Sequence, residues 1–349
     1  MAHFGFPVET VIIFCVVIAF SVFMDLAAHR RVKDITVRDA ALWSVFWISL
    51  ALGFYAYLWA RFDKNWADLY LAGYVLEKSL SVDNLMVFMA IFASFGVKSH
   101  LQHRILYWGI IGALVFRAVF VGVGSGLFLL SPWVGFIFAA IVAWSAWKMM
   151  TAGDAEEEIH DYSDHWSVKL TRKFVPVFPR RVEEQFFVGK SHAEELMQKD
   201  PTISVVKKAA FFATPAFLCL ATIETSDIMF AFDSVPAVIA MTREPLLVYA
   251  AMIFAVLGLR SLYFVLAALT RYLVHLEKAV IVLLYFIAFK LALQSAEHVF
   301  GVDILPISPN LSLLIVLGCL AAGVVASFVW PEKDEKEEDG ALETENDKG

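Results

Sequence analysis

Four acidic residues stand at matched intervals inside two apolar stretches of the chain. Glu77 and Asp83 are six positions apart, and Asp227 and Asp233 repeat that interval in a second acidic motif that begins at Glu224. A carboxylate in hydrocarbon costs about 2.5–3.5 kcal/mol on insertion scales. Two matched pairs at that cost indicate a site with a function.

Carboxylate and amide oxygens dominate both motifs, and such ligands suit hard cations such as Mn²⁺, Mg²⁺ or Ca²⁺. Neither motif holds a His or Cys, which would favour zinc or copper. Met86, Met89 and Met229 lie close by in the sequence, either as thioether ligands, which would favour manganese or ferrous iron, or as packing residues. The candidate metal ligands are Glu77, Asp83, Asn84, Glu224, Asp227 and Asp233.

Basic residues in the apolar stretches allow a second interpretation of the acids. Arg117 and Arg260 lie in the middle of later stretches, and Lys148 and Lys290 follow them by 31 and 30 positions. These side chains either form structural salt bridges with the acids or compete with a cation for them, which would supply a coupling step. Asp25, near the end of the first stretch, is interpreted either as a pathway residue or as an interfacial partner of a neighbouring base.

The composition is that of a membrane protein, with 60% hydrophobic residues, 18% charged residues and a mean hydropathy of +0.68. The net charge of −7 arises almost entirely from the acidic segment 331–349, which is expected to be disordered. We expect no nucleic acid partner. Cys15, Cys219 and Cys319 lie in apolar runs without paired spacing, so they predict neither a disulfide nor a soft-metal site.

The apolar runs predict an all-α polytopic protein with about nine transmembrane helices, multi-pass in the cell inner membrane. Basic residues follow alternate runs: Arg30 and Arg31 after the first, Lys98 and Arg104 after the third, and Arg271 after the seventh. This pattern predicts an outside N-terminus and a cytoplasmic C-terminus. The predicted spans are 8–28, 40–60, 67–96, 105–130, 133–151, 211–241, 246–270, 277–296 and 309–330.

In this topology the third span runs inward and the sixth outward, so the two acidic motifs belong to an inverted 3+3 helix repeat, a recurrent transporter architecture. Six residues along a helix leave Glu77 and Asp83 about 120° apart. Spans 67–96 and 211–241 are longer than a bilayer core requires, and a break in each helix would turn both acids of a motif toward one centre.

The predicted organisation has a soluble segment between two membrane halves. Within 152–210, Gln185–Val188 and Lys207–Phe212 are candidates for a short hairpin, and this segment is either a partner-docking surface or only a connector. The predicted units are 1–66 (first two helices), 67–151 (first repeat), 152–210 (cytoplasmic linker), 211–296 (second repeat), 297–330 (last helix) and 331–349 (acidic tail).

The motifs resemble those of the TerC family of integral membrane proteins. They are Glu77-x-x-Leu-Ser-x-Asp-Asn-Leu, Ala-Thr-Pro-x-Phe-Leu at Ala213, and Glu224-x-x-Asp-x-x-Phe-Ala-x-Asp-Ser-Val-Pro, and the resemblance covers nearly the whole chain. It implies manganese efflux, metal supply to exported proteins or tellurite resistance, and in plastid relatives thylakoid assembly. It also implies that the six acidic and amide residues above form the metal site.

These observations predict a transporter that exports a divalent cation, manganese first, which binds transiently and not as a permanent cofactor. The alternative is a membrane scaffold of a tellurite or stress-resistance complex that docks other resistance proteins through 152–210. We expect no enzyme, because the chain has no Gly-x-Gly-Asp, nucleophile-elbow or phosphate-loop motif.

Overall fold

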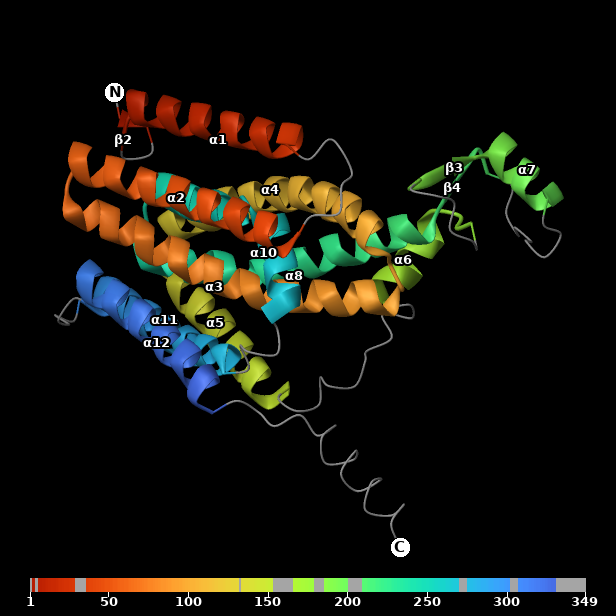
Figure 1. The fold of residues 1–349 in the computed structure, drawn as a ribbon. Coiled ribbons are helices and arrows are strands. Elements are labelled where there is room, and N and C mark those ends of the chain that lie inside the picture. The colour runs from red at the N-terminus through yellow and green to blue at the C-terminus, as the bar shows by residue number, and fades with distance from the viewer. Residues whose placement is uncertain are drawn as a thin grey trace, which may run out of the picture.

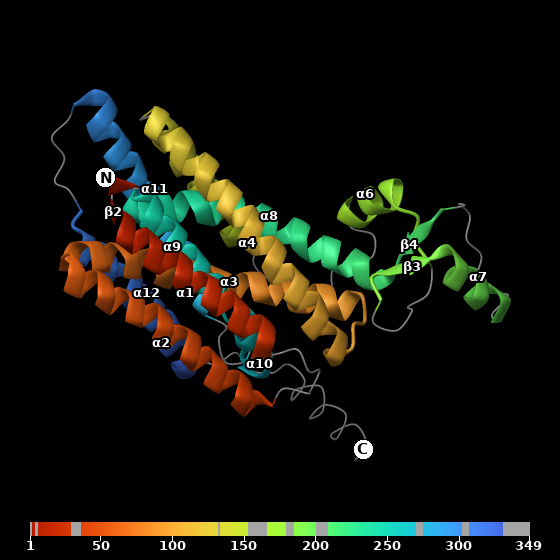
Figure 2. The same cartoon turned by 90° about the horizontal axis from the view of Figure 1, so that it is seen from above.

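The computed structural model describes residues 2–3, 6–28, 36–131, 133–152, 166–178, 185–199, 209–269, 275–301 and 307–330. Long helices lying side by side make up most of the molecule, and a small unit of short elements stands beyond one end of them (Figures 1 and 2). The acidic tail 331–349 and the basic residues that follow the first span lie outside the described residues. The long helices are α1 Val8–Ala28, α2 Val37–Arg61, α3 Lys64–Ser94, α4 Ser99–Leu130, α5 Trp133–Ala152, α8 Pro215–Thr242, α9 Pro245–Val256, α10 Leu259–Leu269, α11 Leu276–Phe300 and α12 Pro309–Val329.

Each predicted span corresponds to helix, if the bent pair α9 and α10 is taken together. By length and composition, six of the described helices could cross a membrane, or seven with that pair. Two of the expected spans are not among these helices: α1, of which Val8–Ser21 counts as a shorter apolar helix among the described side chains, and α3, which carries five charged residues. The count of nine spans therefore stays a prediction, whereas the polytopic, all-helical architecture is confirmed.

The helix starts follow from local capping. The side chain of Asp63 accepts a hydrogen bond of 3.1 Å from the backbone N–H of Trp66 at the start of α3, and Ser308 caps α12 in the same way through Leu311. Pro215, Pro245 and Pro309 stand in the first turns of α8, α9 and α12, where a missing N–H costs nothing.

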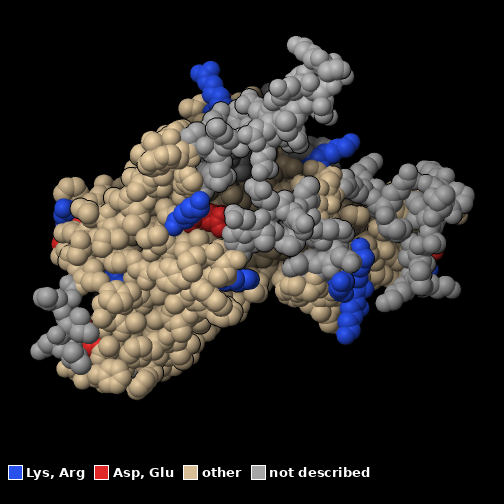
Figure 3. Space-filling view, turned by 90° about the horizontal axis from the view of Figure 1, so that it is seen from below, with Lys and Arg blue, Asp and Glu red and all other residues tan. Residues whose placement is uncertain are grey.

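The helices pack in a reciprocal pattern. α4 packs against α8 while α9 packs against α3, and α3 contacts α8 as α5 contacts α11. α2 covers α3 and α10, and α12 covers α3 and α11. Seen from below, the described surface of the helices carries few charged side chains (Figure 3). Large apolar side chains such as Val16, Phe20 and Phe328 are exposed on the helices, as expected for a lipid-facing surface.

The helix break lies at a different place from the one predicted. α3 and α8 are continuous over 31 and 28 residues, even though α8 contains Pro236, so the predicted breaks in 67–96 and 211–241 are wrong. The break instead separates α9 from α10, which are bent by 49° relative to each other. Gly258 causes it: its φ of +80° favours glycine, and a Cβ there would overlap the Trp47 ring.

The small unit lies next to the ends of α3, α4 and α8 (Figures 1 and 2). It consists of α6 Trp166–Phe174, α7 Lys190–Lys199 and the strands β3 Phe187–Gly189 and β4 Phe211–Ala213, which pair antiparallel. The predicted pairing of these two segments is thereby confirmed, with α7 in the connection between the strands. Two further strands, β1 Ala2–His3 and β2 Phe6–Pro7, pair ahead of α1. Phe178, Val188, Ala193 and Phe212 form the core of the small unit.

Candidate cation-binding centre

A buried arginine joins the two acidic motifs. Arg117 on α4 forms an ion pair with Glu77 on α3, and its guanidinium contacts Asp227 on α8 through Nη2, at 2.9 Å from Oδ1, and through Nε, at 3.4 Å from Oδ2. All three side chains are 4% exposed or less. A bidentate contact of this kind fixes both distance and orientation. Two of the predicted ligands from distant parts of the sequence therefore belong to one centre.

Further acids surround this triad. Asp233 on α8 is hydrogen-bonded to Ser145 on α5 and lies within electrostatic range of Arg117. Asp83 on α3 is within electrostatic range of Asp233 and of Glu277 on α11. The predicted ligands Asp83 and Asp233, one from each motif, therefore lie within electrostatic range of each other.

Several carboxylate oxygens in this region are buried without a hydrogen-bond donor among the described residues. They include Oε2 of Glu77, Oδ2 of Asp83 and Oε2 of Glu224, and the amide Nδ2 of Asn84 is likewise unpaired. A buried ionised oxygen with no partner is strongly disfavoured. Such oxygens suit a site that takes up protons or a cation.

Glycines on α4 let it approach α8 closely at the second motif. A Cβ on Gly109 would touch Ile223, and a Cβ on Gly112 would overlap the carboxylate of Glu224. Glu224 therefore lies directly against the backbone of α4, within electrostatic range of Asp227. Glu224 can take this position because Gly112 has no side chain.

The predicted counter-charges have different environments. Arg117 and Arg260 are each 2% exposed, but Arg260 lies in the first turn of α10. Lys148 is exposed on α5. Lys290 is buried near the far end of α8, where its Nζ is 3.5 Å from Met241 Sδ and it lines a cavity of about 200 Å³ with Arg243. Asp25 lies in α1, and its side chain is outside the described residues.

No three His, Cys, Asp or Glu side chains in the described parts of the chain are close enough together to hold a metal ion. In this conformation the guanidinium of Arg117 lies between Glu77 and Asp227, where a shared cation would neutralise the same charges. The structure thus brings acids of both motifs to one centre and places a tethered cation in it. Met229 is 55% exposed and Met89 packs in an apolar cluster, which fits packing residues better than thioether ligands.

Three contributors were not among the predicted site residues. Ser145 is an inconspicuous hydroxyl in an apolar run, and Gly112 acts only through its lack of a side chain. Lys78, next to Glu77, reaches the carbonyl oxygens of Ala255 and Leu257 instead of an acid. Of these, only Lys78 offered a signal in the sequence, namely a lysine within an apolar run.

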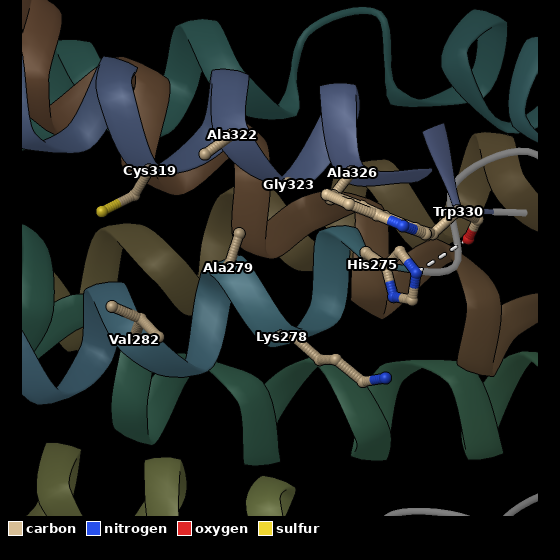
Figure 4. Close-up of a pocket in the computed structure, with 9 residues that line it drawn as sticks. All are labelled: His275, Lys278, Ala279, Val282, Cys319, Ala322, Gly323, Ala326 and Trp330. Carbon is tan, nitrogen blue, oxygen red and sulfur yellow. Dashed lines mark hydrogen bonds between the residues drawn. The ribbon is translucent and has the colours of Figure 1, made fainter. Parts of the chain in front are cut away.

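The larger grooves are separate from this centre. One of about 600 Å³ runs between α11 and α12 and is lined mostly by small or apolar residues, with Lys278 along its edge (Figure 4). At its end, Nε2 of His275 lies 2.9 Å from the carbonyl oxygen of Trp330 (Figure 4). A second groove of about 650 Å³ lies beside Asp68, which accepts a 3.1 Å hydrogen bond from the hydroxyl of Tyr55.

Comparison with known proteins agrees with the resemblance carried by the motifs. Residues 62–335 match the model of the integral membrane protein TerC family. The chain is 51% identical to the tellurium resistance protein TerC of Serratia marcescens over 97% of this chain and 99% of the relative, and 50% identical to the protein of the same name from Alcaligenes sp over 96% and 98%.

A more distant relative is named putative membrane-bound redox modulator Alx in Escherichia coli (strain K12), and is 33% identical over 88% of this chain and 90% of its own length. No solved structure matches this chain. The family model and the near full-length relatives rest on the segment that contains both acidic motifs. The chain is therefore a member of the TerC family of integral membrane proteins.

Proposed function

We propose that this protein exports a divalent cation, manganese first, from the cytoplasm through the buried centre of Glu77, Arg117 and Asp227. The observation that carries the proposal is that one guanidinium joins the acids of both motifs inside the helix bundle. If all three side chains are ionised, their charges sum to −1, and Asp83 and Asp233 add negative charge nearby. A divalent cation is the class of substrate that such a centre attracts.

In this mechanism Arg117 and the transported cation compete for the same carboxylates. Without cargo the guanidinium neutralises Glu77 and Asp227, which avoids leaving two bare charges in an apolar interior. Entry of a divalent cation displaces it, and release of the cation restores the pair. The carboxylates then serve as metal ligands in one state and as counter-ions in the other. Coupling to an inward proton flow completes the cycle, because the chain has no nucleotide-binding motif to drive export.

We further propose that α3, α4 and α5 form one repeat and α8, α9 with α10, and α11 form the other, inverted in the membrane. The reciprocal packing supports this assignment. Exchanging the two repeats turns the contact of α4 with α8 into the contact of α9 with α3, and it leaves the contacts of α3 with α8 and of α5 with α11 unchanged. Inverted repeats around a central site are an established basis for alternating access. The proposed location is the cell inner membrane. The N-terminus then lies outside, and the small unit of α6, α7, β3 and β4 lies in the cytoplasm.

Tellurite resistance enters this proposal as an indirect effect. The names of the relatives from Serratia marcescens and Alcaligenes sp suggest such a role. Tellurite is an oxyanion, however, and a centre rich in carboxylates repels it. We propose that resistance results from metal homeostasis, or from a complex in which the protein takes part.

The test is manganese uptake into inverted membrane vesicles under an imposed proton gradient. Wild type is compared with Asp233→Asn, which removes charge at nearly constant shape, and with Lys148→Gln, an exposed change on α5 as matched control. We expect uptake by wild type and by Lys148→Gln, its loss in Asp233→Asn, and its abolition by a protonophore. If the wild-type vesicles equal empty ones for manganese, magnesium and calcium alike, the transporter proposal is wrong.

The scaffold alternative is favoured by one observation, the apolar residues on the outside of the small unit. Phe174 is 75% exposed, and Phe187 and Phe211, which meet edge to face across the hairpin, are 44% and 55% exposed. A scaffold requires this surface and not the acids. Replacing Phe174 and Phe211 by Ser should then abolish resistance to tellurite in cells, while Asp233→Asn leaves it intact; a transporter predicts the opposite pattern.

A further inference from the structure

The ammonium group of Lys78 contacts carbonyl oxygens at a helix end instead of an acidic side chain. Its Nζ donates to the carbonyl oxygen of Ala255 at 3.0 Å and to that of Leu257 at 3.5 Å. Both carbonyls belong to the break between α9 and α10, and Ala255 and Leu257 are at most 2% exposed. Among the described residues, no carboxylate forms an ion pair with Lys78.

The break itself creates the acceptors. The last four carbonyls of a helix have no partner within it, and they form the negative end of the helix dipole. α9 ends at Val256, and Gly258 turns the chain before α10 begins, so Ala255 and Leu257 present their oxygens in the interior of the bundle. In water these oxygens would be solvated. Here the ammonium group of Lys78 takes the place of the water.

We propose that the break between α9 and α10 is a monovalent-cation site that Lys78 occupies with its own ammonium group. In transporters with discontinuous helices, unwound carbonyls and helix C-terminal ends coordinate a free ion such as sodium. Two neutral carbonyls bring no full negative charge, so the site suits one positive charge, unlike the carboxylate centre, which suits two. Lys78 replaces the free ion with a tethered one.

This assignment gives Lys78 a positioning role. Adjacent residues on a helix point about 100° apart, so Glu77 and Lys78 tie the same turn of α3 to two different neighbours, the triad at Arg117 and the break. Lys78 thereby fixes the start of α10, where Arg260 is buried. Transporters that bind a free ion at such a break need that ion there, whereas the wild-type protein needs no sodium or potassium to keep the break in place.

The experiment measures the Tm of the purified protein in detergent, in a buffer whose only cation is N-methylglucamine. Lys78→Ala removes the ammonium and leaves room for an ion. Loss of two charge-assisted hydrogen bonds lowers its Tm by about 5–10 °C. Adding ethylammonium or sodium restores a large part of that loss in a saturable way, while manganese at the same concentration does not.

Two further variants separate ion binding from a general effect of salt. Lys78→Met fills the same space without charge, so we expect the same loss of Tm and no recovery on adding ethylammonium. Lys148→Ala, at an exposed lysine of α5, should behave as wild type in every buffer. The inference is overturned if Lys78→Ala shows no response to either ion, if Lys78→Met responds equally, or if Lys78→Ala yields no folded protein even when purified with ethylammonium. None of these outcomes depends on manganese transport, so the proposed export function is tested separately.

Discussion

At the scale of single residues, Arg117 decides whether the acids of the two motifs can coexist. It compensates Glu77 and Asp227 in a setting where all three side chains are almost fully buried. A buried ion pair contributes little against a well-packed apolar alternative, but removing one partner leaves an uncompensated charge. Removing Arg117 would therefore leave the buried charges of Glu77 and Asp227 without a counter-charge.

Arg117→Gln should lower the free energy of unfolding by about 3–5 kcal/mol, because it leaves two buried carboxylates without a counter-charge. Adding Asp227→Asn to Arg117→Gln should recover part of that loss, since one of the two charges is then gone. The measurement is unfolding in mixed detergent micelles, with the exposed Lys148→Gln as control, whose effect should stay within about 0.5 kcal/mol. Equal stability of Arg117→Gln and wild type would show that the pair does not matter.

The residues of the site could be predicted from the sequence to the extent that they carry charge. A charged side chain in an apolar run is conspicuous, and Glu77, Arg117 and Asp227 are found in this way. Which charge pairs with which could not be predicted, because Lys148 and Lys290 look equivalent to Arg117 in the sequence yet lie elsewhere. Spacing along a chain does not give the separation between helices.

At the scale of elements, the approach of α4 to α8 depends on glycine. Gly112→Ala would push a methyl group into the carboxylate of Glu224, and if Glu224 is a ligand of the cation as proposed, disturbing its support costs about 10–100-fold in affinity or activity. We expect a loss of that size in manganese uptake by vesicles with normal amounts of inserted protein. Gly126→Ala on the same helix is the matched control, since a Cβ there meets nothing within 4 Å. Unchanged uptake in Gly112→Ala would remove Glu224 from the pathway.

The long helices and the pairing of β3 with β4 were predicted, whereas the break, α6, α7 and the pairing of β1 with β2 were not. Apolar runs predict the long helices because lipid leaves the backbone no other partner, and the hairpin of β3 and β4 follows from its two aromatic runs. The break was expected near the acids on grounds of length. It formed at Gly258 instead, because a positive φ and the closeness of Trp47 are properties of the folded chain, and nothing in the local sequence reveals them.

At the scale of the whole molecule, the proposed orientation places the start of α3 outside and the start of α8, together with the small unit before it, in the cytoplasm. With Cys15, Cys219 and Cys319 replaced, a cysteine in place of the exposed Lys64 should react with an impermeant maleimide in spheroplasts. A cysteine in place of Gly189, where a Cβ has open space, should react only in inverted vesicles. The reverse pattern would contradict the outside N-terminus and, with it, the direction of export.

The hairpin has one more consequence, and it is mechanical. Only Thr214 separates β4 from α8, and its hydroxyl donates a 2.6 Å hydrogen bond to the carbonyl of Gln185 while its N–H donates to that of Phe186. The small unit and α8 are thus joined without a slack linker, and Glu224 lies ten residues along the same rod. A partner that binds the hairpin in the aqueous phase is therefore coupled directly to α8, the helix that carries the second motif. A displacement of the small unit would move α8 and change the position of its acids.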